Sequence, residues 1–301
     1  MSTHPSLPTS TTLALTTQYP PRPYRGIQDC KRAVLSLYDH IYPHPDNTTS
    51  QYLSYNNITP ASFHSLRRFR HRLERHVRFT YFPDISTVLI KVQTPMTRKL
   101  WLILNQDTNV SLNIMGVDLD EREEPFNPVI YTATAVASGS QKEADSTHKN
   151  GLLRSTDEMD WPNWVIESGL SESESLSRLH QDVNWWIGCS GGQVLLVLVF
   201  VVSSGERTLT VEKYFPRQQL RQDGGGGGPV TRARAAEGRM PQLVSRTVVD
   251  LKVNPPAVEG PPVVLEFERM IGRQPVGPDE HDVVFGVADL IQIGEKVFCG
   301  I

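Results

Sequence analysis

The stretch from Trp161 to Val202 restricts the possible folds of this chain more than any other part of its 301-residue sequence. It begins with an apolar run, Trp164 to Ile166, that is followed at once by the carboxylate of Glu167. It ends with nine consecutive apolar residues, Val194 to Val202. A run of this length suits a strand that is buried on both faces, and it is too short to cross a bilayer. Burying the Glu167 carboxylate is costly unless it is paired, hydrogen-bonded or bound to a metal.

A helix is expected between these two strands. Ser171 and Glu174 match the capping box S-x-x-E, in which a hydroxyl and a carboxylate each satisfy a backbone amide at the helix start. The glycines between 188 and 192 end an apolar pattern with spacings of three and four, formed by Leu176, Leu179, Val183 and Trp186. A strand, a helix and a strand connected in this way favour parallel strands with the helix on one face of the sheet.

The glycine segment at the end of this helix also matches a catalytic pattern. Residues 188 to 192 read G-C-S-G-G, which fits the G-x-S-x-G of hydrolase nucleophiles. That motif requires a strand before the serine and a helix after it, whereas the predicted order here is the reverse. We therefore interpret the glycines as a helix end.

Composition excludes several classes of protein. The apolar fraction of 39% is ordinary for a globular protein of one or two domains, and the net charge of -3 excludes a uniformly basic nucleic-acid binder. Three widely spaced cysteines, Cys30, Cys189 and Cys299, argue against a disulfide framework and against a zinc cluster. The N-terminal residues show neither the basic segment nor the long apolar segment of a secretion signal. We expect an intracellular protein, in the cytoplasm or nucleus, without membrane contact.

Changes in composition along the chain predict five segments. They are a disordered tail (1–25), an N-terminal helical region (26–84), a core (85–215), a flexible insertion rich in glycine and arginine (216–242), and C-terminal strands with a short helix (243–301). Hydrophobic periodicity predicts core strands at 86–93, 129–137, 142–147, 163–168, 194–202 and 208–214. Core helices are predicted at 172–187 and at 96–115, with an interruption around 105–109. Beyond the core, strands are predicted at 244–253 and 263–271, and a short helix within 285–298.

Residues 62 to 78 carry a strong local concentration of positive charge. Their apolar residues recur at helical spacing while arginines occupy the other faces, which predicts a basic amphipathic helix. The arginines either contact nucleic-acid phosphates or form a solvated face partnered by acidic residues elsewhere. The insertion at 216–242 has the same two interpretations, a tolerated surface loop or a contact with RNA or DNA. The candidate nucleic-acid contacts are Arg67, Arg68, Arg72 and Arg75, together with Arg178 in the later helix.

A group of carboxylates forms the candidate catalytic site. Asp145 lies in the predicted strand 142–147 and Glu167 in the next strand, and two carboxylates brought together from adjacent strands repel unless a cation lies between them. Mg²⁺ or Mn²⁺ binds one or two such ligands together with phosphate oxygens, and lowers the pKa of a bound water. Glu143 shares a strand face with Asp145 and is expected to assist, whereas Lys142 faces away.

Three segments of the chain resemble the PD-(D/E)XK nuclease superfamily, which has the restriction-endonuclease-like fold. They are KEAD (142–145), WPNWVIESGLSES (161–173) and LHQDVNWWI (179–187). The strands at 193–202 and 208–214 share in the resemblance, and the order of predicted elements over residues 85–215 fits as well. Within the superfamily, the chain looks like a group of fungal proteins related to bacterial restriction endonucleases. The resemblance implies an α/β fold with a mixed β-sheet core flanked by helices, to which extra C-terminal strands are added.

The resemblance also implies roles for individual residues. Asp145 matches the metal-binding aspartate of the superfamily, and Glu167 matches its second acid. Ala144 replaces a proline, which is a minor change. Gly169 replaces the lysine that polarises the attacking water in active members, and glycine has no group for that task. Lys142 or Arg178 could supply the missing charge, but Lys142 would need a β-bulge to reach Asp145.

Two functions follow from these observations. One is a metal-dependent phosphodiester hydrolase acting on DNA or RNA, with Asp145 and Glu167 as metal ligands and with Glu143 and Lys142 as further catalytic residues. The other is a non-catalytic module of nuclease fold that binds a partner or serves as a scaffold. The missing lysine favours the second, and the retained acids favour the first. No organic cofactor is expected in either case.

Overall fold

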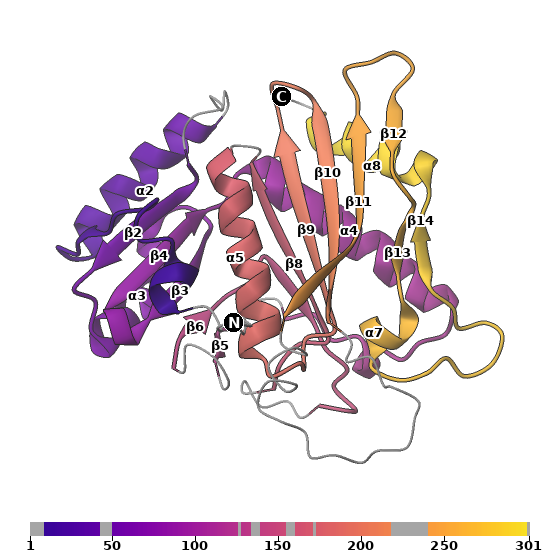
Figure 1. Ribbon diagram of the computed structural model, residues 1–301, viewed down its shortest axis with the longest axis horizontal. Helices are drawn as coiled ribbons and strands as arrows, with labels where there is room; N and C mark the ends of the chain where they lie inside the picture. Colours follow the sequence, from indigo (N-terminus) through magenta and orange to yellow (C-terminus); the bar gives the residue numbers. More distant parts are fainter. Residues whose placement is uncertain are drawn as a thin grey trace, which may run out of the picture.

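The computed structural model describes residues 9–42, 50–125, 128–133, 139–154, 160–170, 173–217 and 240–299. These residues form two six-stranded mixed sheets, a two-stranded sheet and flanking helices (Figure 1). The predicted class, an α/β fold with mixed sheets flanked by helices, is confirmed. The strands divide between two large sheets, whereas the sequence indicated one mixed core sheet.

The first sheet is built mainly from the N-terminal third of the chain. Its order is β1-β2-β4-β3-β6-β5, with β1 and β2 parallel and the other pairs antiparallel. The strands are β1 (Arg22–Pro23), β2 (Tyr52–Asn56), β3 (Val77–Phe82), β4 (Thr87–Val92), β5 (Tyr131–Thr132) and β6 (Gln141–Lys142). Its neighbouring helices are α2 (Ile27–Ile41), α3 (Pro60–Arg68) and the 3₁₀ turns η1 (Arg70–Leu73) and η2 (Pro83–Ile85).

The second sheet contains the unit predicted from residues 161 to 202. Strand β8 (Trp164–Leu170) leads into α5 (Ser173–Cys189), and the chain returns in β9 (Leu196–Ser203), which pairs with β8 in parallel. The sheet order is β12-β11-β10-β9-β8-β7. Its remaining strands are β7 (Ser146–His148), β10 (Thr208–Pro216), β11 (Pro241–Asp250) and β12 (Ala257–Glu259).

Helices cover both faces of the second sheet (Figure 1). Leu179 of α5 packs with Val165 and Val197 on one face. On the other face, Ile166 belongs to the core cluster that contains Leu100 of α4 (Pro95–Ile114). Because both faces of the sheet are covered, β9 carries apolar residues at every position but its last, Ser203. The C-terminal part adds β13 (Val263–Leu265), α7 (Phe267–Ile271), β14 (Val283–Phe285) and α8 (Val287–Phe298).

The N-terminal region differs from its prediction. Residues 10–14 of the expected disordered tail form α1 (Ser10–Ala14), whose Leu13 and Ala14 are buried in the same cluster as α5. A short apolar anchor is therefore enough to fix a segment of otherwise polar composition. Residues 26–84 are not only helical, because they contain β2 and β3. The expected boundary between 84 and 85 separates β3 from its antiparallel partner β4. Residues 1–8, and residues 218–239 of the predicted insertion, lie outside the described residues.

The prediction of a basic helix over residues 62–78 was wrong about the length of the helix. Helix α3 ends at Arg68, the 3₁₀ turn η1 follows, and Glu74 adopts a left-handed conformation with φ of 57°. Val77 and Arg78 then belong to β3, where Val77 pairs with Val92. Long-range strand pairing has overridden the helical periodicity, which is a weak preference on its own.

Three further predictions need correction. Helix α4 runs without interruption through 105–109, where the buried Asn105 donates a hydrogen bond to the Ser146 hydroxyl at 2.9 Å. The strand at 129–137 is represented by β5, and residues 134–138 lie outside the described residues. The strand at 263–271 is divided into β13 and α7. Among the described helices, none is long and apolar enough to span a membrane.

Candidate functional site: a buried charge cluster beside a basic cleft

The predicted strand 142–147 is where the chain passes from one large sheet to the other. Lys142 pairs with Thr80 in the first sheet, and Ser146 pairs with Ile166 in the second. Residues 143 to 145 connect the two strands without belonging to either. Because β7 and β8 are antiparallel, the residues next to the Ser146–Ile166 pair, Asp145 and Glu167, face each other.

A lysine from the first sheet joins these two acids. The Lys91 ammonium of β4 lies 2.7 Å from Asp145 Oδ2 and 3.2 Å from Glu167 Oε2. Asp145 Oδ2 also accepts hydrogen bonds from the Ser168 amide at 2.7 Å and the Ser168 hydroxyl at 2.6 Å. Its other oxygen, Oδ1, accepts one from Gln93 Nε2 at 2.7 Å. The aspartate is thereby held by four donors.

Glu167 continues this network toward α5. Its Oε1 accepts a hydrogen bond from Trp186 Nε1 at 2.7 Å and lies 3.1 Å from Lys142 Nζ. Lys142 is also 2.9 Å from Asp182, which Arg178 approaches to 2.8 Å. We call these six charged residues the charge cluster: Lys91, Lys142, Asp145, Glu167, Arg178 and Asp182. It contains three cations and three carboxylates, and every member is buried.

The structure refines one prediction about this cluster and corrects another. Lys142 was expected to face away from Asp145; among the described residues no hydrogen bond or ion pair joins the two, and the Lys142 ammonium lies by Glu167 and Asp182. Arg178 was expected at a nucleic-acid surface. It is 1% exposed and donates hydrogen bonds to Asp182 and to the carbonyl of Leu13.

Glu143 belongs to a separate group of charges. It is fully buried, and its carboxylate accepts hydrogen bonds from Arg70 and from the Phe79 amide, the latter at 3.1 Å. Arg67 lies 3.8 Å away. Glu143 therefore lies with the arginines of the basic segment, and among the described residues no hydrogen bond or ion pair joins it to Asp145 or Glu167.

The environment of the charge cluster shifts the pKa of its members. Burial opposes the ionisation of Asp145, but Lys91 and Arg78 outweigh it and lower the pKa of that carboxyl. Burial alone would lower the pKa of Lys91, but the surrounding carboxylates raise it by more. The pKa of Lys91 is therefore higher than that of an ordinary lysine. For Glu167, burial is the largest influence and raises the pKa, despite the opposing charges of Lys142 and Lys91. Lys91 and Asp145 therefore form a stably ionised pair.

The donor set of the two acids does not fit a divalent metal. Mg²⁺ requires free carboxylate oxygens and usually retains several waters. Here, each of the four oxygens of Asp145 and Glu167 already has a donor, and the Lys91 ammonium lies between the two groups. The described part of the chain also contains no group of three or more histidine, cysteine or acidic residues that could hold a metal.

The position at which the resemblance implies a lysine is closed. A β-carbon added to Gly169 would lie 2.9 Å from Leu179 Cδ1 and 3.6 Å from Gln51 Nε2. A lysine there would have to displace the packing between β8 and α5. Gly169 is thus a packing residue in this fold.

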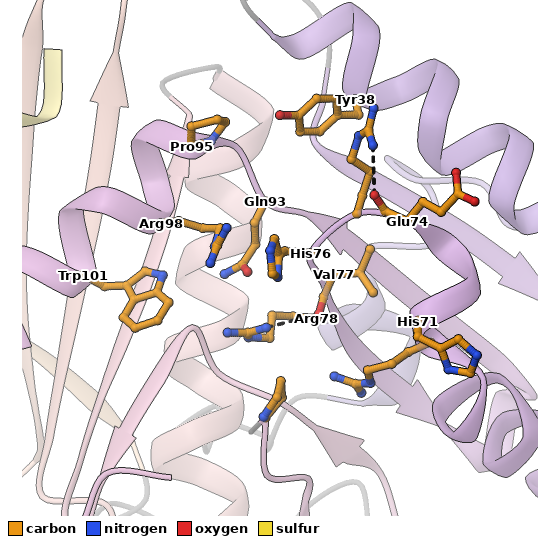
Figure 2. A pocket seen from close by; sticks show the side chains of 13 residues that line it. Tyr38, His71, Glu74, His76, Val77, Arg78, Gln93, Pro95, Arg98 and Trp101 are labelled. Carbon is orange, nitrogen blue, oxygen red and sulfur yellow. Dashed lines mark hydrogen bonds between the residues drawn. The ribbon is translucent and has the colours of Figure 1, made fainter. Parts of the chain in front are cut away.

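A cleft of about 790 Å³ opens beside the charge cluster (Figure 2). Gln93 lines the cleft and also donates to Asp145. Figure 2 shows Arg78, Arg98, Gln93 and His76 gathered at the centre of the cleft, with Trp101 at one side. The basic residues that line it are Arg70, His71, Arg75, His76, Arg78 and Arg98.

The cleft is positively charged. Among its described lining residues Glu74 is the acidic one, and Glu74 pairs with Lys31 at 2.6 Å. Burial, followed by the charges of Arg98 and Arg78, lowers the pKa of His76. A second hollow of about 490 Å³ shares Arg70 with the cleft. We call the two hollows together the basic cleft.

The predicted phosphate contacts are partly found in this cleft. Arg75 lines the larger hollow, and Arg67 and Arg68 line the smaller one. Arg72 instead lies over the ring of Phe69, 4.6 Å from its centre. Sequence reasoning missed Lys91 and Arg98. Lys91 had a detectable signal, because it interrupts an apolar strand in the same manner as Glu167.

Comparisons with known proteins show a distant likeness. No protein-family model and no curated protein matches the sequence. Among solved structures, the chain is similar to a protein from Anabaena variabilis described as a "putative nuclease belonging to DUF820". The TM-score is 0.34 and the identity 11%, over 56% of this chain and 93% of that chain. A likeness of this degree carries no argument about function.

Proposed function

We propose that this protein binds the phosphodiester backbone of nucleic acid in the basic cleft and does not hydrolyse it. The observation that supports this proposal is the concentration of arginine side chains in the basic cleft, where they outnumber the acids that pair with them, Glu143 and Asp39. Arg98 forms no ion pair within the described part of the chain, and Arg78 donates to backbone carbonyls of Ala144 and Asp145. Guanidinium groups of this kind match the geometry of phosphate oxygens.

Nucleic acid is a suitable ligand for such a surface. Its backbone presents closely spaced phosphates, and basic side chains that neutralise them release bound counterions. The arginines extend from the smaller hollow, at Arg67 and Arg68, into the larger one, at Arg75 and Arg98. A surface of this extent suits several consecutive phosphates.

The charge cluster is the reason to propose binding without hydrolysis. Asp145 and Glu167 are buried, each of their oxygens already has a donor, and Gly169 offers no group to activate a water. A cluster of equal positive and negative charge has no need of a metal. We accordingly propose that neither Mg²⁺ nor Mn²⁺ is required for the function.

One observation favours a second candidate, a Mg²⁺- or Mn²⁺-dependent nuclease. Asp145 and Glu167 are adjacent, and Gln93 connects Asp145 to the wall of the cleft. Hydrolysis would require Lys91 to leave its position between the two acids. Incubation of DNA and RNA with the protein and either metal tests this candidate, with Glu167→Gln as the control. Cleavage by the wild type that is lost in Glu167→Gln would establish the nuclease.

Equilibrium binding of fluorescently labelled oligonucleotides, measured by anisotropy at several salt concentrations, tests the proposed function. We expect affinity to fall as salt rises. Arg98→Gln should weaken binding about tenfold, which corresponds to about 1.4 kcal/mol and to the loss of one charge-assisted hydrogen bond. The matched control is Arg246→Gln on β11, whose side chain is 57% exposed and does not line the cleft. Equal affinities for the two variants would overturn the proposal.

A further inference from the structure

We infer that the basic cleft takes single-stranded nucleic acid, with one unpaired base against Trp101 and the hydrogen-bonding edge of that base at Gln93. This inference rests on the proposed function and specifies the form of its ligand. It is based on polar atoms that the protein buries in the cleft without pairing them, and on the size and aromatic lining of the cleft.

Four buried polar atoms of the basic cleft lack a hydrogen-bond partner among the described residues. Three are donors, Arg67 Nε, Arg75 Nε and Trp101 Nε1, and one is an acceptor, Gln93 Oε1. Buried polar atoms are nearly always paired, so an unpaired one that lines a cleft is available to a ligand. A phosphate could accept from Trp101, but it offers no donor to Gln93. A ligand that pairs with both atoms therefore carries N–H or O–H donors as well as negative charge.

The unpaired base of a single strand meets this requirement. Its amino and imino groups are free to donate, whereas in a duplex these groups are used in base pairing. Aromatic side chains such as Tyr38 and Trp101, both in the lining of the cleft, provide faces on which unpaired bases stack. A hollow of about 790 Å³ has the size of a small-molecule site, which suits a nucleotide of a single strand better than a whole duplex.

The charge cluster gains a role from this arrangement. Gln93 is 2% exposed, and its Nε2 is fixed by Asp145 Oδ1 at 2.7 Å. Asp145 is in turn fixed by Lys91 and Ser168. Because the amide nitrogen is anchored in this way, the amide oxygen is held unpaired at the cleft. Asp145 is thus a positioning residue for Gln93.

The test compares labelled 12-residue single strands of DNA and of RNA with duplexes of the same sequence, by anisotropy and by intrinsic fluorescence. The chain has five tryptophans, and Trp161, Trp164, Trp185 and Trp186 are all at most 2% exposed. Quenching by an added strand therefore reports on Trp101. We expect single strands to bind at least tenfold more tightly than duplexes and to quench the fluorescence. Trp101→Leu should weaken single-strand binding about fivefold and abolish the quenching, while Arg246→Gln changes neither.

Gln93→Met separates recognition from folding. It removes the acceptor with little change in volume, and its thermal unfolding shows whether the loss of the Asp145 hydrogen bond has affected the fold. If this variant remains folded, we expect it to lose most of the preference for single strands over duplexes. It should still bind duplexes weakly. If Gln93→Met unfolds, Trp101→Leu tests the inference instead, because Trp101 lies outside the charge cluster.

The outcomes distinguish this inference from the proposed function. Duplexes that bind as tightly as single strands, or single strands that bind without quenching, would overturn the inference and leave the basic cleft as a phosphate-binding surface. Failure of both forms to bind would overturn the proposed function itself. A preference for RNA or for DNA single strands would identify the source of the ligand and support the inference in either case.

Discussion

The charge cluster and the basic cleft use the same kinds of side chain in opposite ways. In the cluster, three cations and three carboxylates are paired at distances of 2.7 to 3.2 Å and are buried. In the cleft, arginines outnumber the acids that pair with them, since Glu143 pairs with Arg67 and Arg70, and Asp39 with Arg75. Gln93 belongs to both, since it lines the cleft and donates to Asp145.

The difference shows how to separate structural from ligand-binding charges. A buried charge with an opposite partner contributes to the specificity of the fold. Removing one partner of such a pair leaves the other charge buried and uncompensated, and this loss of stability exceeds the stability that the intact pair contributes. Charges without partners create a potential that attracts a ligand. In this fold the acids resemble a catalytic pair by position, yet their charge is already balanced. The cleft beside them is not balanced, and that is where we expect binding.

The largest effect is expected from Lys91→Met. This change leaves two buried carboxylates without the cation between them and should lower the free energy of unfolding by about 3–5 kcal/mol. Denaturant unfolding measures it. The matched control is Lys252→Met, an exposed lysine paired with Glu206, which should leave unfolding unchanged. Comparable stability of Lys91→Met and the wild type would remove the structural role of the cluster.

Acid should destabilise the protein through His148. Burial lowers the pKa of this histidine to about 3, so the folded state keeps it neutral while the unfolded state binds a proton below about 6.5. The unfolded state therefore gains protons first, and stability falls as the pH decreases from 6.5 toward 3, by about 2 kcal/mol at pH 5. His148→Gln should flatten this dependence. The exposed His281→Gln should not, and an identical pH profile for both variants would contradict the burial account.

A smaller effect is expected at the position of the missing lysine. Gly169→Ala places a methyl group against Leu179 and should destabilise the fold by about 1 kcal/mol, because extra volume in a packed core forces side chains to shift. Thermal unfolding measures the change. A stabilised variant would show that space exists beside Glu167 for a catalytic side chain.

The smallest effect concerns His76 in the cleft. Its pKa is lowered by burial and then by the charges of Arg98 and Arg78, so a bound phosphate should offset those charges and raise it. An NMR titration with and without a short single-stranded oligonucleotide should show this increase at His76, whereas His148 should not respond. A His76 pKa unaffected by a ligand that binds would place the binding site elsewhere.

The sequence predicted local features better than long-range ones. The β8-α5-β9 unit follows from periodicity within residues 161 to 202, and adjacent strands brought Asp145 next to Glu167 as expected. The partner of these acids, Lys91, lies in another sheet, and nothing in the local pattern showed that the chain changes sheets between Lys142 and Ser146.

The basic segment illustrates the same limit. Its arginines were visible in the sequence, but their arrangement depends on the end of α3 at Arg68 and on the pairing of β3 with β4. Arg98 comes from α4 and joins the cleft only through tertiary packing. Arg178 was expected at the surface but is buried, and this too depends on tertiary packing. Its guanidinium donates hydrogen bonds to Asp182 and to the carbonyl of Leu13.

The most direct test mixes the wild-type protein with a labelled single-stranded oligonucleotide in the presence of Mg²⁺, of Mn²⁺ or of a chelator. Anisotropy measures binding, and a gel shows whether the strand remains intact. We expect binding that weakens with salt, is unchanged by the chelator and leaves the strand intact. Metal-dependent cleavage that disappears in Glu167→Gln would contradict this expectation, because the acids would then be a catalytic pair and not a balanced structural cluster.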